Sequence, residues 1–186
     1  MKSTGNVEFD KNKVLSKCFY CLVEKGLEKT TTRDICLATG MQSSSLYYWF
    51  KNKDEIIVDA TLWGMSHIVD ELFAAAYSHL RDLNVLFAEF PKEALKFKYE
   101  LKFIYQVVTS PQYGSSLREI SAQLPMAYDS YAKVLADQLG CNYDEIRPII
   151  YMFIAVTVDF IVWEDDTKAE MQFEYLHAQL SKLIKR

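Results

Sequence analysis

Between residues 42 and 53 the sequence gathers small polar, aromatic and basic side chains directly after a glycine, Gly40. Hydroxyl and amide groups bond base edges and phosphate oxygens, and lysines neutralise phosphates, so these residue types suit nucleic-acid binding. The candidates for this chemistry are Gln42, Ser43, Ser44, Tyr47, Trp49, Lys51 and Lys53. We therefore treat this segment as a candidate interface with a nucleic acid.

A second set of reactive residues is the Cys-x-x-Cys pair Cys18 and Cys21, with Cys36 further along the chain. Thiols at this spacing could bind zinc or form a redox pair. A free cysteine also behaves as a small hydrophobic residue, and no histidine or second cysteine pair lies nearby. We favour a role in the core and keep redox sensing and zinc binding as alternatives.

Helices must position the candidate interface. Apolar residues recur at helical spacing over 10–25, and Gly26 is a suitable stop. Thr30 to Thr32 offer an N-cap for a helix over 32–39, which Gly40 ends. A long helix is predicted to open with the capping pattern of Asn52 and Glu55.

The segment between Thr31 and Phe50 has the pattern of a helix-turn-helix. Ile35 and Ala38 give the first helix an apolar side, and Gly40 permits the sharp turn. Leu46 and Phe50 anchor the second helix, over 43–50, to the core. The polar and aromatic candidates then remain outside, where a major groove could receive them.

In the rest of the chain apolar residues recur at helical spacing, and no stretch shows the sustained alternation of apolar and polar residues that is typical of strands. Helices are predicted over about 91–108, 115–123, 125–139, 143–163 and 167–185, with Pro91 beginning or kinking the first of these. The fold class is therefore all-α, with about nine helices. A change in composition divides the chain into residues 1–53 and residues 54–186.

Composition and charge narrow the function. The 186 residues are 50% hydrophobic and include only 6 Gly and 4 Pro, which excludes disordered, collagen-like and glycine-rich nucleotide-loop proteins. Residues 1–53 hold nine Lys or Arg against five Asp or Glu, whereas the remainder holds twelve against twenty. A basic N-terminal part on an acidic body suggests a polyanionic partner.

Motifs for other classes of protein are missing from the sequence. There is no secretory signal, and the longest apolar run, Ile149 to Trp163, is shorter than a typical membrane span. Hydrolase, metalloprotease and phosphate-loop motifs are also missing. We expect a cytoplasmic protein that is not an enzyme, with no cofactor, no metal and no membrane partner.

Three stretches carry a resemblance to a known family. Gly26 to Ile35, Thr39 to Met41 and Leu46 to Glu55 resemble the N-terminal domain of TetR-family transcriptional regulators, over roughly residues 12–60. Total length and helix count fit that family as well. The resemblance implies a helix-turn-helix DNA-binding domain over 1–53, followed by a helical effector-binding and dimerisation body over 54–186.

The resemblance also implies roles for single residues. Thr31, Thr32, Tyr47 and Lys53 match positions that contact phosphates, and Arg33 matches one that contacts a base or a phosphate. Ser43 and Ser44 lie at the tip of the recognition helix. Gln42 stands where most members have a Ser or Thr N-cap. Because Gln caps poorly, Ser43 is an alternative cap, and either serine is a candidate to read a base.

The body is rich in aromatic and thioether side chains, most of which we expect in the core. The resemblance implies that a subset lines an effector pocket, for which the candidates are Trp63, Phe97, Tyr105, Tyr128, Tyr131, Met152 and Asp159. Asp159 lies inside an apolar run, where an unpaired carboxylate is costly. A ligand cavity, a dimer seam and the solvent edge all stay open for it.

The last two predicted helices carry the expected dimer interface. Ile150, Ile154, Val158 and Ile161 recur at spacings of four, four and three residues and so form one helical stripe. The resemblance implies that these helices pair with their two-fold mates, with Met171, Leu176 and Leu180 on the last helix facing the stripe.

The expected function is sequence-specific binding of double-stranded operator DNA by a homodimer. We expect a repressor that is released by a small hydrophobic or aromatic effector. The alternatives are a helical small-molecule binding protein and a protein–protein adaptor, neither of which would bind DNA.

Overall fold

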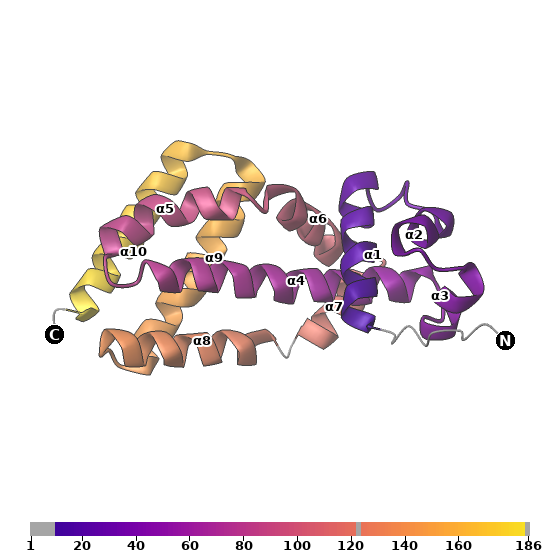
Figure 1. Ribbon diagram of the computed structural model, residues 1–186. Helices are drawn as coiled ribbons and strands as arrows, with labels where there is room; N and C mark the ends of the chain where they lie inside the picture. The colour runs from indigo at the N-terminus through magenta and orange to yellow at the C-terminus, as the bar shows by residue number, and fades with distance from the viewer. Residues whose placement is uncertain (1–9, 122–123, 185–186) are drawn as a thin grey trace. The chain divides into compact units, whose positions relative to one another are not determined.

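The computed structural model describes residues 10–121 and 124–184, without the side chains of residues 120–128. Those residues form ten α-helices and no strand (Figure 1), which confirms the all-α class. The chain divides into two compact units, Met1–Gly64 and Met65–Arg186. One helix, α4 (Lys53–Ser78), contributes residues to both units.

Unit 1 contains α1 (Lys11–Lys25), α2 (Thr32–Thr39), α3 (Ser43–Trp49) and the first part of α4. Its core consists mainly of buried apolar side chains: Leu15, Cys18, Phe19, Leu22, Ile35, Leu46, Phe50, Ile56, Ile57 and Ala60. Ala38 is exposed, contrary to the prediction, and the buried neighbours in α2 are Ile35 and Thr39. Thr39 is tolerated there because its hydroxyl donates to the carbonyl of Ile35.

Two cysteines belong to the core of unit 1. Cys18 is fully buried and Cys21 nearly so, whereas Cys36 is half-buried. Burial raises the pKa of the Cys18 thiol to about 12. A thiol with such a pKa stays protonated at neutral pH, and protonated thiols are poor nucleophiles and poor metal ligands. This environment favours the core role for Cys18.

Unit 2 contains the rest of α4 and six further helices. These are α5 (Leu83–Leu95), α6 (Lys98–Thr109), α7 (Gly114–Ser121), α8 (Leu124–Leu139), α9 (Tyr143–Trp163) and α10 (Asp166–Ile184). α9 packs against both α8 and α10, and α10 packs also against α5. Phe90 of α5, Phe160 of α9 and Phe173 of α10 meet in the main core cluster of the unit.

The structure corrects the prediction of one helix over 91–108. Pro91 lies inside α5, which begins eight residues earlier at Leu83, with Asp82 as its N-cap. The chain leaves helical geometry at Phe97, whose φ is −101° and ψ is 20°, and α6 begins directly afterwards. A tight last turn, in which Phe97 donates to the carbonyl of Ala94, closes α5. The break adds one helix to the expected nine.

Helix α9 is the one described helix that is long and apolar enough to cross a membrane. Such a helix alone does not indicate a membrane protein, because the central helix of a helical bundle has the same composition. Here α9 packs against α5, α6, α8 and α10 within unit 2.

Candidate nucleic-acid interface and ligand cavity

A reciprocal set of hydrogen bonds fixes the beginning of α2. The Thr31 hydroxyl accepts from the backbone N–H of Asp34 at 3.2 Å, and the Thr31 N–H donates to the Asp34 carboxylate at 2.8 Å. Lys25 of α1 donates to the same carboxylate at 2.5 Å. Lys25 and then Thr31 hold the pKa of Asp34 well below its usual range. The predicted cap is thus confirmed, and the Thr31 hydroxyl is already used in it.

The turn between α2 and α3 depends on Gly40. Its φ of 74° lies in the left-handed region, which residues with a side chain adopt only at a cost. The backbone N–H groups of Gly40 and Met41 both donate to the carbonyl of Cys36 and so close the end of α2. The turn predicted at Gly40 is therefore confirmed.

Helix α3 is anchored on one side and open on the other. Leu46 and Phe50 are buried in the core of unit 1. The remaining side chains of the helix are exposed, as is that of Gln42 directly before it: Gln42, Ser43, Ser44, Ser45, Tyr47, Tyr48 and Trp49. This division matches the predicted inner and outer faces of the helix.

Gln42 occupies the N-cap position of α3, and its side chain makes no capping hydrogen bond. Ser43 does not replace it, because Ser43 lies inside the helix and its hydroxyl is 3.7 Å from the Cys36 thiol. The alternative cap at Ser43 was therefore wrong. The N-terminal N–H groups of α3 lack a side-chain partner in this part of the described chain. A phosphate oxygen could accept from them.

A pair of hydroxyls links α2 to α3. Thr32 Oγ1 lies 2.9 Å from Tyr47 Oη, so two residues expected to contact phosphates are in contact with each other. Two hydroxyls at this distance retain free lone pairs and can together bind one more acceptor or donor. They therefore form a single polar site on the surface rather than two separate ones.

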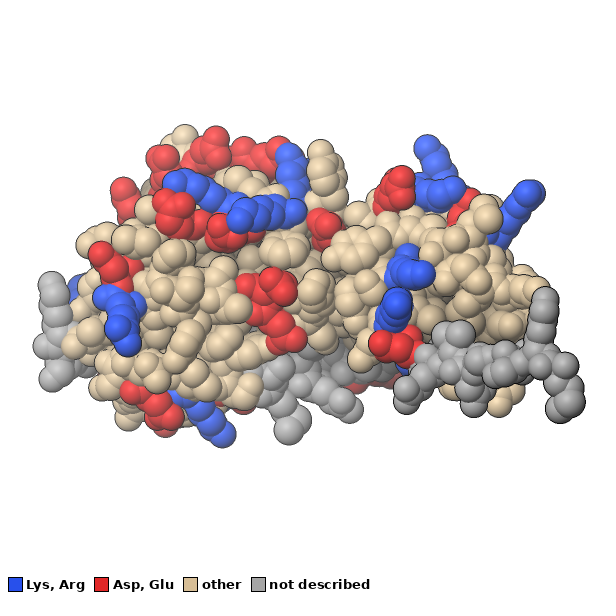
Figure 2. Space-filling view, viewed as in Figure 1, with Lys and Arg blue, Asp and Glu red and all other residues tan. Residues whose placement is uncertain are grey.

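Lys53 begins α4 directly after this region. The Asn52 side chain accepts from the backbone N–H of Glu55 at 2.8 Å, which confirms the predicted cap. Arg33 and Lys51 are exposed and Lys53 is half-buried. Figure 2 shows basic side chains standing out from unit 1, with acidic ones among them.

Two exposed residues near the interface were missed by sequence reasoning. Tyr48 is 80% exposed and stands edge-on to Trp49 with ring centroids 5.3 Å apart, while Leu37 of α2 is 74% exposed. Together they add an apolar component to the exposed sides of α2 and α3. The exposure of Tyr48 could have been predicted from its position in the helical repeat, which places it on the side opposite to the buried Leu46 and Phe50.

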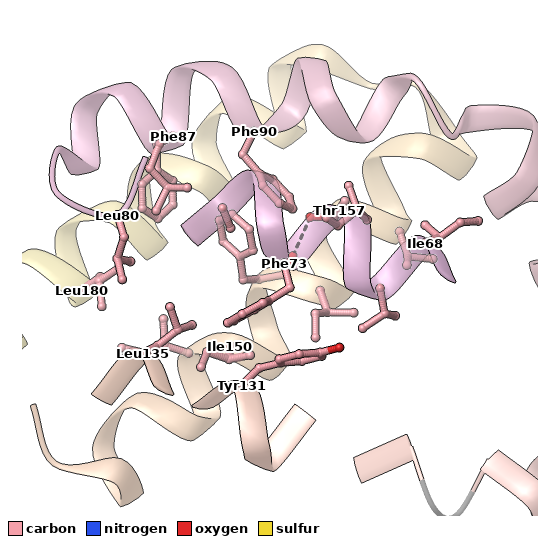
Figure 3. Close-up of a pocket in the computed structure, with 18 of the residues that line it drawn as sticks. Ile68, Phe73, Leu80, Phe87, Phe90, Tyr131, Leu135, Ile150, Thr157 and Leu180 are labelled. Atoms are coloured by element: carbon pink, nitrogen blue, oxygen red, sulfur yellow. Dashed lines mark hydrogen bonds between the residues drawn. The ribbon is translucent and has the colours of Figure 1, made fainter. Parts of the chain in front are cut away.

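Unit 2 contains an apolar cavity of about 220 Å³. Its walls come from α4, α5, α6, α8, α9 and α10, and Figure 3 shows Phe73, Phe87 and Phe90 among them. No lining side chain is charged. The two lining hydroxyls already have partners, because Thr157 donates to the carbonyl of Phe153 and Tyr131 donates to the carboxylate of Asp70.

The predicted pocket residues are mostly elsewhere. Tyr131 is the one member of the set that lines the cavity. Trp63 packs on Phe19 and Tyr20 in unit 1, and Tyr105 and Met152 are exposed. Phe97 precedes α6 and does not reach the cavity, and the Tyr128 side chain lies outside the described residues. Asp159 does not line the cavity and forms an ion pair with Lys168 at 2.6 Å.

The predicted dimer stripe also needs correction. Ile150, Ile154 and Val158 are half-buried and line the cavity. Ile161, Leu176 and Leu180 are buried within their own unit, so a second chain could not contact them without unfolding it. Met171 alone of the set is open, with 64% of its side chain exposed. The helical stripe is present, three of its members line the cavity, and its part in a dimer stays a prediction.

A different apolar surface of α9 and α10 is exposed. Met152 and Trp163 of α9 are separated by eleven residues, close to three turns, and so lie on one side of the helix. Met171 and Tyr175 of α10 are one turn apart, and 60% of Tyr175 is exposed. We call these four residues the outer apolar stripe.

The anchored α3, the turn at Gly40 and the capped α2 define a helix-turn-helix DNA-binding unit within an all-α chain. Residues 19–60 match the sequence profile of the family described as bacterial regulatory proteins, tetR family. The N-terminal part of the chain is therefore a TetR-family domain, which supports a DNA-binding transcriptional regulator of the TetR type.

Solved structures support the fold. A protein assigned to the TetR-family transcriptional regulators of Syntrophomonas wolfei is 18% identical, with a TM-score of 0.56 and 94% of both chains covered. A transcriptional regulator from Rhodococcus sp. Rha1 is also 18% identical, with a TM-score of 0.55 over 95% of this chain and 97% of that one. At this identity the likeness concerns the fold alone. A search of curated proteins gives no significant match.

Proposed function

We propose that the chain is a repressor that binds operator DNA as a homodimer in the cytoplasm and is released by a small neutral apolar effector. The observation that carries this proposal is the combination of an exposed recognition helix in unit 1 with an apolar cavity in unit 2. Repression is the simplest mode of action, because a dimer that covers a promoter blocks it by occupancy alone.

Contacts with DNA come from α2, α3 and the start of α4. The hydroxyl pair of Thr32 and Tyr47 and the ammonium group of Lys53 contact phosphates, which position the unit without reading sequence. Ser44 is exposed at the first turn of α3 and reads a base edge, with Ser43 and Arg33 as further readers. Thr31 contributes by holding α2 in place and not through its own hydroxyl.

The effector class follows from the walls of the cavity. A charged ligand would lose its hydration without finding a counter-charge, which costs several kcal/mol or more. A polar ligand would find both lining hydroxyls occupied. A cavity of roughly 150 Å³ with similar walls accommodates benzene. A volume of about 220 Å³ therefore suits a larger aromatic or branched aliphatic molecule.

Dimerisation buries the outer apolar stripe. Met152 and Trp163 are exposed apolar side chains of α9, and Met171 and Tyr175 are exposed apolar side chains of α10, which packs against α9. A second copy presents the same stripe, and two-fold pairing covers both at once. The dimer supplies two recognition helices for successive major grooves, which are about 34–36 Å apart.

The test begins with selection of binding sites for the full chain from a random pool of duplex DNA. Gel retardation of the selected duplex is then titrated with N-phenylnaphthylamine, a neutral apolar fluorophore, and with its sulfonated analogue as matched control. We expect the neutral compound to release the DNA and the sulfonate to be far weaker. No enrichment of any duplex at low salt would overturn DNA binding and favour the adaptor or the small-molecule carrier. Equal potency of the two compounds would overturn the effector class.

A further inference from the structure

Tyr131 is in contact with the cavity and with α4 at the same time. Its ring lines the cavity and stacks on Phe73 with ring centroids 4.1 Å apart and an interplanar angle of 21° (Figure 3). Its hydroxyl donates to a carboxylate oxygen of Asp70. Asp70 and Phe73 are three residues apart on α4, so they lie on neighbouring turns of one helix face. Tyr131 of α8 thus holds α4 at two adjacent points.

The other hydroxyl of the cavity wall has no such reach. Thr157 donates to Phe153, four residues earlier in its own helix α9. Among the lining residues, which all belong to the described part of the chain, Tyr131 is the polar residue with a hydrogen bond to another helix. Any shift of its ring is therefore transmitted to a different element.

Helix α4 is the covalent path from the cavity to the recognition helix. It lines the cavity with Ile68, Leu72 and Phe73 and runs without interruption back to Lys53. Only Phe50 to Asn52 separate Lys53 from the end of α3. A change in how α4 is held in unit 2 can therefore reach α3 through one continuous helix.

We propose that Tyr131 is the positioning residue that reports occupancy of the cavity to α4, through its hydrogen bond to Asp70. This inference rests on the proposed function, because it requires an apolar effector. A ligand that fills the cavity competes for the face of Phe73 and displaces the Tyr131 ring. The phenol then leaves Asp70, and α4 loses one of its attachments to α8. The ligand binds this released form better and so shifts the population towards it.

The quantity to measure is the coupling ratio, which is the dissociation constant for the selected duplex with saturating N-phenylnaphthylamine divided by that without it. We expect a ratio of at least about fivefold for the wild-type chain, in the usual range of allosteric coupling. Tyr131→Phe keeps the ring and removes the hydroxyl. We expect it to bind the fluorophore at least as tightly as wild type, because the ring is kept and no hydrogen bond to Asp70 has to be broken. Its coupling ratio should fall below about twofold, because the attachment is already absent.

Two further variants separate this role from a purely structural one. Asp70→Ala removes the acceptor of the hydrogen bond. Because Asp70→Ala and Tyr131→Phe break the same hydrogen bond, each single variant and the double variant should have the same coupling ratio. Tyr151→Phe is the matched control. Tyr151 Oη donates to Asp129 of α8 at 3.2 Å, but Tyr151 does not line the cavity, so this variant should keep the wild-type ratio.

The outcomes are distinct. A wild-type ratio in Tyr131→Phe, with fluorophore binding retained, overturns the role of Tyr131 and leaves the proposed function standing. If Tyr151→Phe also loses the coupling, the role of Tyr131 is overturned, because loss of any tyrosine hydroxyl in the unit would then have the same effect. If the wild-type chain takes up no fluorophore or binds no duplex, the proposed function itself fails, and this is seen before any variant is made.

Discussion

The Phe19 ring of α1 lies directly against the backbone of Gly64 in α4. A Cβ placed on residue 64 would come within 2.3 Å of that ring, which is closer than real Cβ contacts occur. Phe19 is fully buried and also contacts Trp63, with ring centroids 5.9 Å apart. Glycine at 64 therefore lets two helices of unit 1 approach closely, and this approach holds α4 against α1.

Replacing Gly64 by Ala should destabilise unit 1. The added methyl group gains about 1 kcal/mol in helix propensity, but overpacking a buried ring costs about 1–3 kcal/mol. We expect a net loss in the free energy of unfolding, measured by urea denaturation followed by circular dichroism. Ser66→Ala, two residues further at an exposed position, is the control and should be nearly neutral. A Gly64→Ala variant as stable as wild type would show that the contact has no energetic weight.

Glu164 gives a prediction for pH dependence. It ends α9 with a positive φ of 55° and pairs with Lys98 and Lys102 of α6, the former at 2.6 Å. The bonds to Lys102 and Lys98 lower the pKa of Glu164 from 4.5 to about 2. A carboxylate whose pKa is lower in the folded state stabilises the protein above its unfolded pKa, and this contribution is lost as the pH falls through the folded pKa.

We therefore expect Glu164→Gln to unfold more easily than wild type at pH 7. The gap should narrow between about pH 4.5 and about pH 2. Urea denaturation at several pH values measures it. Glu170→Gln on α10 is the control, because Glu170 is exposed and belongs to none of the ion pairs described above. A gap between wild type and Glu164→Gln that stays constant with pH would contradict the role of the two lysines.

The local architecture of unit 1 could be predicted from sequence because its signals are short in range. The bond between Thr31 and Asp34 spans three residues, as does that between Asn52 and Glu55. Gly40 ends α2 through its own backbone geometry. Each feature depends on neighbours along the chain, so residue type and spacing suffice.

The cavity could not be predicted in the same way. The spacing of Ile150, Ile154 and Val158 shows that one side of α9 is apolar, but a helical period does not say whether a cavity or a second chain covers it. Tyr105 and Tyr131 are the same residue type, and only long-range packing leaves one exposed and places the other in the cavity wall. The contact between the Thr32 and Tyr47 hydroxyls, fifteen residues apart in sequence, likewise depends on packing between helices.

Ser44 and Ser43 should differ in their effect on base preference. Ser44 is exposed at the start of α3, whereas the Ser43 hydroxyl lies beside the Cys36 thiol. We expect Ser44→Ala to change the preferred base at one or two positions of each half-site, and Ser43→Ala to change it less. Selection from a random duplex pool measures both. If both variants select the wild-type site, base reading lies elsewhere, and Arg33 is the next candidate.

The dimer should depend on the outer apolar stripe. Met171→Glu places two like charges near the two-fold axis, at a cost of several kcal/mol. The dimer dissociation constant should rise by more than about a hundredfold, and affinity for the selected duplex should fall with it. Light scattering measures the first and gel retardation the second. Val85→Glu on α5, at a position 39% exposed, is the matched control and should stay dimeric. A wild-type monomer with full affinity for DNA would contradict this interface.

The central claim is that unit 1 binds DNA through phosphate contacts around α3. Its most direct test is the dependence of duplex binding on salt concentration for wild type, Lys53→Ala and, as control, Lys182→Ala on α10. Each lysine that neutralises a phosphate contributes about 0.9 to the slope of log affinity against log salt. We expect a steep slope for wild type and Lys182→Ala, and a slope lower by about 0.9 for Lys53→Ala on every duplex tested. Binding that does not change with salt, or an unchanged slope in Lys53→Ala, would contradict the account.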